Sequence, residues 1–245
     1  ESQVSVAYTT NEVEAATKHD IHTCGSFGVA IPSNVTDISR GAFQNSKQLV
    51  LLTMPESVRT IGDSAFENCI SLESITFGES VTHIGDDAFR YCASLEIITL
   101  GASVTHIGAG AFVNCRSLES ITLGESVTHI GDDAFLYCNS LESITLGESV
   151  THIGSRAFAN CTSLKGITLG ESVKKIGRNA FANCTSLKSI RFPESLRHIL
   201  ERELGVTTMA RIAIPAKQGR KRLRNEWVSV QNLLCYHWLQ SATCR

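Results

Sequence analysis

The sequence predicts an α/β-type repeat solenoid, in which copies of one short unit stack along a single axis. A period of 23 residues persists over seven copies without slippage, and such a period is the signature of a repeat architecture. Each copy carries about seven apolar residues at fixed positions, which is too few to form a core alone. Successive copies can therefore bury these residues only against one another.

The order of apolar residues within each copy predicts two extended segments. The pattern L-x-x-I-x-L, as in Leu95, Ile98 and Leu100, predicts a short strand with these three side chains turned inward. The phrase S-V-T-H-I-G predicts a second extended segment on the opposite wall, where Val104 and Ile107 point inward. The glycine that follows marks a turn, in which a residue without a Cβ bends easily.

The segment A-F-x-x-C-x-S closes each copy and is expected to form a helical or 3₁₀ turn. Its phenylalanine should fill the core, and the seven phenylalanines are Phe43, Phe66, Phe89, Phe112, Phe135, Phe158 and Phe181. Three residues later, six copies carry a cysteine, namely Cys69, Cys92, Cys115, Cys138, Cys161 and Cys184. Stacked side chains have parallel Cβ vectors, which is poor disulfide geometry, and no C-x-x-C spacing of a zinc ribbon occurs. We therefore expect buried cysteines that act as small core residues. A bridge between Cys235 and Cys244, outside this row, stays open.

A histidine also recurs at one position, with Lys175 between the last two copies: His83, His106, His129, His152 and His198. Because its neighbours point inward, this position should point outward, from the wall that carries no sheet. Imidazoles about 5 Å apart lower each other's pKa. The simplest interpretation is a surface residue copied with the repeat, while a soft transition-metal site and a pH-sensitive contact stay open. Since nothing supplies a third ligand, we predict no metal site.

Composition argues against several classes of protein. Hydrophobic residues make up 42% and charged residues 19%, which is typical of a globular chain. No apolar run approaches the roughly 20 residues of a transmembrane helix, and the N-terminus lacks the basic start and apolar stretch of a signal peptide. The net charge of −2 combines −13 over residues 1–150 with +11 over residues 151–245. The basic run near the C-terminus has no nucleic-acid motif beside it and is interpreted as a solvated helix face, so no nucleic-acid partner is expected. Self-association through the polarised ends stays open.

The repeated pattern resembles the BspA-like (Treponema pallidum-type) leucine-rich repeats over about residues 25–200. The shared residues are C-x-x-L-x-x-I-x-L followed by I-G-x-x-A-F, and seven copies agree in register. In two respects the chain departs from the pattern. A G-E-S turn follows the strand where an Asn or Cys is usual, and proline remains in that turn only at Pro32, Pro55 and Pro193. The resemblance implies a right-handed leucine-rich repeat coil with short parallel strands on one face, little regular helix and a helical C-terminal cap.

The same resemblance suggests a domain organisation and a role. Residues 1–24 are expected to form an N-terminal tail or cap, residues 25–200 the solenoid, and residues 201–245 the C-terminal cap. Proteins of this type are associated with adhesion to extracellular matrix proteins. The resemblance therefore implies a bacterial cell-surface, periplasmic or secreted protein that binds host or extracellular components.

Outward positions of the predicted strands are the candidate binding surface, because the sheet face of a solenoid usually carries its function. Most copies place Glu, Ser and Thr there, but three apolar residues break the pattern and, with Met54 and Phe27, suggest an exposed apolar patch near the N-terminal end. This patch is either covered by the protein's own N-terminal segment or is a partner site. Two tyrosines in an Asn position are either contact anchors or edge packing. The candidate binding residues are Val50, Leu51, Ile97, Thr53, Thr76, Thr99, Tyr91 and Tyr137.

No catalytic motif accompanies these surfaces. The sequence lacks a nucleophile elbow, H-E-x-x-H, a P-loop and a dinucleotide-binding glycine pattern. The paired carboxylates Asp86–Asp87 and Asp132–Asp133 lie in a repeated turn, whereas catalysis needs one asymmetric constellation. We therefore predict a non-enzymatic protein–protein interaction module without a cofactor. A self-assembling structural scaffold and a site for an apolar ligand are the alternatives.

Overall fold

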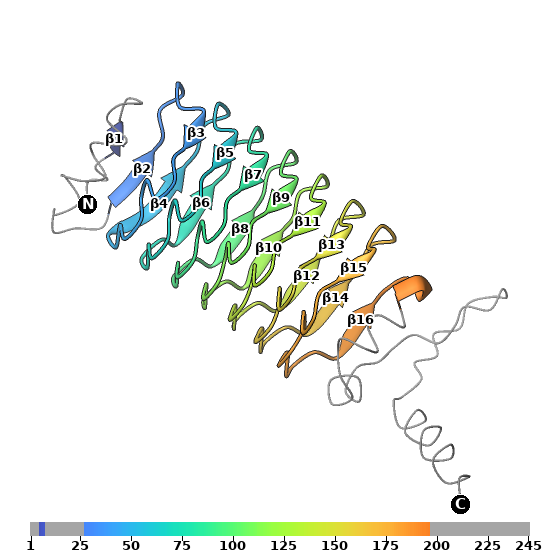
Figure 1. Ribbon diagram of the computed structural model, residues 1–245. Coiled ribbons are helices and arrows are strands. Elements are labelled where there is room, and N and C mark those ends of the chain that lie inside the picture. Colours follow the sequence, from blue (N-terminus) through green and yellow to red (C-terminus); the bar gives the residue numbers. More distant parts are fainter. Residues whose placement is uncertain (1–4, 8–26, 197–245) are drawn as a thin grey trace, which may run out of the picture.

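The computed structural model describes residues 5–7 and 27–196, and these form a coil of stacked turns (Figure 1). The predicted parallel-strand solenoid with almost no helix is confirmed: the one helical element in the described ranges is the 3₁₀ turn η1 (Glu194–Leu196). The predicted C-terminal cap at 201–245, His198, Cys24, Cys235 and Cys244 all lie outside the described residues.

One wall of the described coil is a parallel sheet in which the L-x-x-I-x-L segments pair with a constant offset of 23 residues. Ile121, for example, lies opposite Ile98 on one side and Ile144 on the other, and all three are buried. The nine strands, in order across the sheet, are β1 (Ser5–Ala7), β2 (Phe27–Ala30), β4 (Leu49–Thr53), β6 (Ser74–Thr76), β8 (Ile97–Thr99), β10 (Ser120–Thr122), β12 (Ser143–Thr145), β14 (Gly166–Thr168) and β16 (Ser189–Arg191). Within the predicted N-terminal tail or cap, β1 adds a strand beside β2.

The opposite wall is a second parallel sheet, so the expectation that the histidines project from a wall without a sheet was wrong. Two residues of each S-V-T-H-I-G segment are enough to form a strand of this sheet, because stacking places each backbone N–H opposite a carbonyl of the preceding coil. The Gly108 N–H, for example, donates to the Ile84 carbonyl at 2.8 Å. Among the described residues the seven strands are β3 (Asp37–Ile38), β5 (Thr60–Ile61), β7 (His83–Ile84), β9 (His106–Ile107), β11 (His129–Ile130), β13 (His152–Ile153) and β15 (Lys175–Ile176).

The A-F-x-x-C segment is not the helical or 3₁₀ turn that was expected. Ser64 and Asn68 have φ values of 52° and 62°, in the left-handed region, and these residues interrupt any helical hydrogen-bond series. Alternate N–H groups then point along the axis of the coil: the Phe66 N–H donates to the Ala88 carbonyl of the next coil at 2.7 Å. The remaining groups close local turns, as from the Cys69 N–H to the Phe66 carbonyl at 3.2 Å. The turn region is therefore held by contacts between coils as well as within them.

A ladder of stacked phenylalanines occupies the interior. Neighbouring rings from Phe43 to Phe181 have centroids 5.0–5.5 Å apart and planes within 8° of parallel. All seven rings are buried with the inward Leu, Ile and Val residues, as the sequence predicts. The rise of about 5 Å per coil matches the strand spacing of a sheet, so ring stacking and backbone pairing reinforce each other.

The six cysteines of the ladder are free and buried, which confirms their predicted role in the core. Each thiol donates to the carbonyl of a phenylalanine in the coil before it, at 3.1–3.3 Å, as from Cys69 Sγ to the Phe43 oxygen. Burial raises the pKa of Cys69 and of Cys184 to about 12, because a thiolate would lose its hydration there. Since the thiolate is the reactive form, these side chains are chemically inert in the folded coil.

Candidate interaction surfaces

The outer face of the nine-stranded sheet carries columns of equivalent residues from successive coils. Thr53, Thr76 and Thr99 occupy one column in register, and all three are exposed. A neighbouring column consists mainly of Ser or Gly, but Leu51 and Ile97 stand in it with exposures of 37% and 58%. Both pair with Ser74, from opposite sides, so the structure places these two apolar side chains two coils apart in one column.

Other members of the predicted apolar patch do not join it. Met54 is buried, at 3% exposure, because it occupies the last inward position of the L-x-x-I-x-L pattern; its inclusion was wrong. Val50 is half-buried, and the side chain of Phe27 lies outside the described part of the structure. Of the predicted patch, Leu51 and Ile97 are the two large apolar side chains that the structure shows exposed on the sheet face.

Tyr91 and Tyr137 lie elsewhere, on the turn edge of the coil, in a column that the other copies fill with Asn. Their exposures are 39% and 43%, and their φ values are 60° and 63°. Asn tolerates this left-handed region, whereas a side chain such as Tyr pays about 1–2 kcal/mol for it. Ile70, also exposed at 40%, lies along the same edge and was missed by the sequence analysis. Its signal was an apolar residue at the position after the cysteine, where other copies carry Ala or a polar residue.

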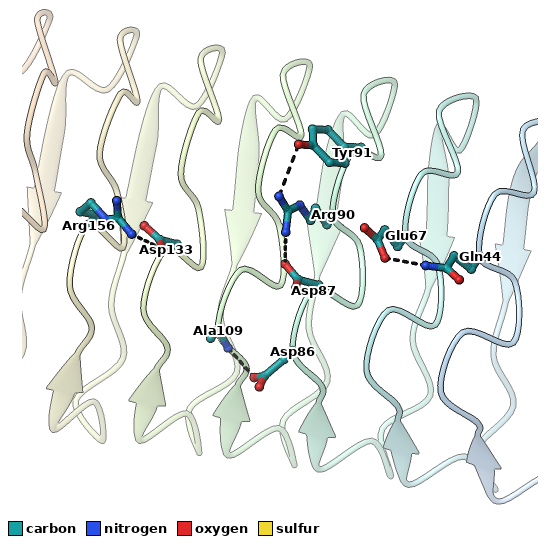
Figure 2. A network of polar contacts seen from close by, with 9 residues as sticks. All are labelled: Gln44, Glu67, Asp86, Asp87, Arg90, Tyr91, Ala109, Asp133 and Arg156. Atoms are coloured by element: carbon teal, nitrogen blue, oxygen red, sulfur yellow. Dashed lines mark hydrogen bonds and ion pairs between the residues drawn. The ribbon is translucent and has the colours of Figure 1, made fainter.

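A network of polar contacts runs along this edge (Figure 2). The Arg90 Cζ lies 5.0 Å from the centre of the Tyr91 ring, and Arg90 Nη2 lies 3.4 Å from the tyrosine oxygen. Arg90 Nη1 also contacts Asp87 Oδ1 at 3.2 Å. The guanidinium thus holds the Tyr91 ring in place from one side.

The paired carboxylates accept hydrogen bonds from backbone N–H groups of the next coil and pair with a basic side chain there. Asp86 Oδ1 accepts a hydrogen bond from the Ala109 N–H at 2.7 Å (Figure 2). In the same way, Asp132 Oδ1 accepts a hydrogen bond from the Ser155 N–H at 2.6 Å. Asp133 forms an ion pair with Arg156 at 2.7 Å. These contacts link one coil to the next, which is a structural use of the repeated acidic turn.

The histidine column on the seven-stranded sheet is a stack of parallel rings. Centroids of His83, His106, His129 and His152 are separated in turn by 5.2, 4.8 and 4.6 Å. The Nδ1 atom of each ring lies 2.8–2.9 Å from the hydroxyl of the preceding threonine. Each of these hydroxyls donates its one proton to a carbonyl of the preceding coil, at 3.0–3.1 Å. We infer that Nδ1 carries the proton and donates to threonine, which leaves Nε2 as the acceptor in each neutral ring.

Two rings of this stack, His106 and His152, are harder to protonate than free imidazoles. Desolvation lowers the pKa of His106, and His129 and His83 add to the effect. Desolvation is also the main cause that lowers the pKa of His152, and the charges of His129, Lys175 and Lys174 lower it further. The described residues contain no group of three or more His, Cys, Asp or Glu side chains placed to hold a metal ion.

Folding should therefore become less favourable in mild acid. Because the pKa values of His106 and His152 are lowered in the fold, the unfolded chain binds more protons as the pH falls below 6.5. Their stabilising effect is complete above that pH and is lost as the pH falls towards the folded values. Thr60 occupies the position equivalent to His106. When the pH is lowered from 7.5 to 5, the urea-unfolding midpoint should therefore fall less in His106→Thr than in the parent. The two proteins should respond equally between pH 7.5 and pH 8.5, where imidazoles are neutral; an identical loss in acid would contradict this account.

Comparison with known proteins agrees with this architecture. The family profile of the BspA type leucine rich repeat region matches the chain in six copies, over residues 22–142 and 105–221. The chain belongs to the BspA-type leucine-rich repeat family. The crystal structure of a T. pallidum leucine-rich repeat protein is similar to it, with 32% identity, a TM-score of 0.65, and coverage of 74% of this chain and 84% of that one. A leucine-rich repeat protein from Bacteroides ovatus is 27% identical with a TM-score of 0.50, covering 67% of this chain and 55% of its own length. No curated protein matches the sequence.

Membership of the BspA-type family supports the general class of function. Leucine-rich repeat proteins are typically protein-interaction modules and generally non-enzymatic scaffolds, and BspA-like members are typically surface or secreted proteins. No helix in the described residues is long and apolar enough to cross a membrane.

Proposed function

We propose that this BspA-type chain binds a protein partner through the outer face of its nine-stranded sheet, anchored on Leu51 and Ile97. The observation that carries the proposal is the exposure of these two side chains in a column of Ser and Gly residues. Fully burying a side chain of this size is worth about 1.5–3 kcal/mol. An outward apolar residue in an otherwise polar column gains that free energy only when something covers it.

The surroundings of the two anchors fit a protein interface. Exposed Thr53, Thr76 and Thr99 run along one side of the column, and the exposed carboxylates of Glu73 and Glu96 lie on the other. A few apolar anchors within a polar rim is the arrangement of many binding surfaces. Residues 5–7 pair with β2 at the edge of the sheet, so this part of the N-terminal segment extends the sheet and does not cross its face.

We further propose that the partner is an extracellular host or matrix protein and that this chain acts at the cell surface, in the periplasm or after secretion. The cysteine ladder is compatible with an oxidising environment, because burial keeps the thiols protonated and out of reach of oxidants.

A double substitution tests the sheet-face anchors. Changing Leu51 and Ile97 to Ser restores the residue type of their column and should leave the fold intact. Binding to a panel of purified extracellular-matrix proteins, measured by biolayer interferometry, should weaken at least about tenfold for each protein that the parent binds. Ser143→Ala, farther along the same column, is the matched control and should bind like the parent. Undiminished binding by the folded double variant would rule out these anchors, and light scattering over a range of salt concentrations would show whether the chain instead assembles with itself.

A further inference from the structure

The turn edge of the coil contains a column of seven left-handed residues, and two of them are unsuited to that conformation. All seven have φ values of 59–66°: Asn45, Asn68, Tyr91, Asn114, Tyr137, Asn160 and Asn183. Asn fits because its short amide tolerates this region and bonds along the column, as from Asn68 Nδ2 to Asn45 Oδ1 at 2.7 Å and from Asn183 Nδ2 to Asn160 Oδ1 at 3.0 Å. At positions 91 and 137 the chain carries tyrosine in place of the asparagine of the other five copies.

The fold itself does not recover this cost by burying the rings. Tyr91 and Tyr137 are among the five large hydrophobic side chains that are exposed in the described residues. Backbone strain of this kind that persists at an exposed position points to a functional role for the side chain.

Spacing along the coil suggests what the two rings recognise. Tyr91 and Tyr137 each lie two residues after a ring of the phenylalanine ladder, and two steps of 5.2 Å separate Phe89 from Phe135, so the tyrosines are about 10 Å apart along the axis. Asn114 stands in the column between them. Its Oδ1 accepts from Nε and Nη2 of Arg116, both at 3.3 Å, which places polar groups midway between two aromatic ones.

We propose that this edge binds an extended β-1,4-linked polysaccharide, with Tyr91 and Tyr137 as stacking platforms. In such a chain each sugar is turned over relative to the last, so every second ring presents the same apolar C–H face in the same direction. The two-coil step of the solenoid corresponds to that disaccharide repeat. The amide of Asn114 and the guanidinium of Arg116 lie where the hydroxyl groups of the intervening sugar need hydrogen-bond partners.

This pattern fits a saccharide better than a protein. A flat aromatic ring matches the apolar C–H face of a sugar, which the aliphatic side chains of Leu51 and Ile97 do not, and here two such rings alternate with polar groups along the edge. Arg90 is a positioning residue in this account, because it holds the Tyr91 ring from one side through its contact with the ring and with Asp87 (Figure 2). The site lies apart from the column of Leu51 and Ile97 and goes beyond the proposed protein-binding role.

The test uses cellohexaose and chitohexaose as probes, with an α-1,6-linked dextran oligosaccharide as the non-matching chain. The intact protein should bind at least one of the β-1,4-linked probes by isothermal titration calorimetry and should not bind dextran. Changing both Tyr91 and Tyr137 to Asn should weaken binding at least tenfold while raising the urea-unfolding midpoint, because the substitution restores the preferred residue of the column. Loss of binding in a more stable protein is not explained by misfolding.

A second variant tests the spacing at constant composition. Tyr137→Asn combined with Asn160→Tyr moves one ring to the next coil, so the two rings stand three steps of 5.2 Å apart. Binding should fall as far as in the variant without either tyrosine. The proposal is overturned if the parent protein binds neither probe, if the displaced pair binds as well as the parent, or if the tyrosine variants lose only protein binding. The Leu51 and Ile97 double variant should bind saccharide normally, which keeps this result separate from the sheet-face proposal.

Discussion

Replacing Phe112 by Ala is expected to lower the free energy of unfolding by about 4 kcal/mol. The ring is fully buried and stacks on Phe89 and on Phe135 at 5.2 Å, so its removal leaves a cavity and breaks the ladder in both directions. Each stacked pair adds about 0.5–1.5 kcal/mol beyond the burial of area. Urea unfolding followed by circular dichroism at 218 nm measures the loss.

Because Phe112 lies in the middle of the coil, its replacement by Ala should also make unfolding less cooperative. In a repeat protein each unit is stabilised by its neighbours, so a weakened central interface lets the two halves unfold separately. We expect a broader transition for Phe112→Ala than for the parent. Phe112→Leu, which fills most of the same volume, is the matched control and should cost less than half as much. Equal midpoints for the parent and the Ala variant would show that the ladder does not hold the coils together.

Adding a single methyl group at Gly131 should destabilise the protein by about 3 kcal/mol or more. A Cβ at this position would lie 2.6 Å from the Ala109 nitrogen and 2.6 Å from the Gly108 carbonyl carbon, both of which belong to the backbone of the preceding coil. No side chain can rotate away to relieve these contacts. The two coils must separate locally, which weakens the hydrogen bond from the Gly131 N–H to the Ile107 carbonyl, now 2.9 Å long.

Gly147 supplies the control for this substitution. A Cβ there would meet the Gly124 oxygen at 3.5 Å, which is ordinary van der Waals contact. Gly147→Ala should therefore stay within about 1 kcal/mol of the parent, and thermal unfolding of the two alanine variants side by side gives the comparison. If Gly131→Ala is as stable as Gly147→Ala, close approach of the coils does not explain the glycine that recurs after the inward Ile of the second sheet.

The Gly131 comparison shows a limit of the sequence analysis. The recurring glycine predicts a turn, for which conformational freedom is the obvious reason, yet Gly131 is not among the residues with positive φ. Its role comes from the distance between adjacent coils, which the sequence does not contain. Ile70 shows the same limit for exposure, because its position after the cysteine does not reveal that its side chain is exposed. Met54 differs, because it occupies the last inward position of L-x-x-I-x-L and its burial follows from the repeat.

What the sequence determined by itself is the period, the inward columns and the inert cysteine row. In a solenoid each position of the repeat has one environment, so a residue type that recurs every 23 positions shows which way it points. The family follows from the repeat itself, and the exposed positions of Leu51, Ile97, Tyr91 and Tyr137 follow from departures from it.

Only the tertiary structure decided how neighbouring coils meet. The second sheet, the left-handed turns in place of a helix, the stacking of the histidine rings and the strained backbone of the two tyrosines all depend on contacts across the rise of about 5 Å between coils. A linear period sets which residues face one another, but backbone angles and hydrogen-bond partners are settled by the three-dimensional distance between them.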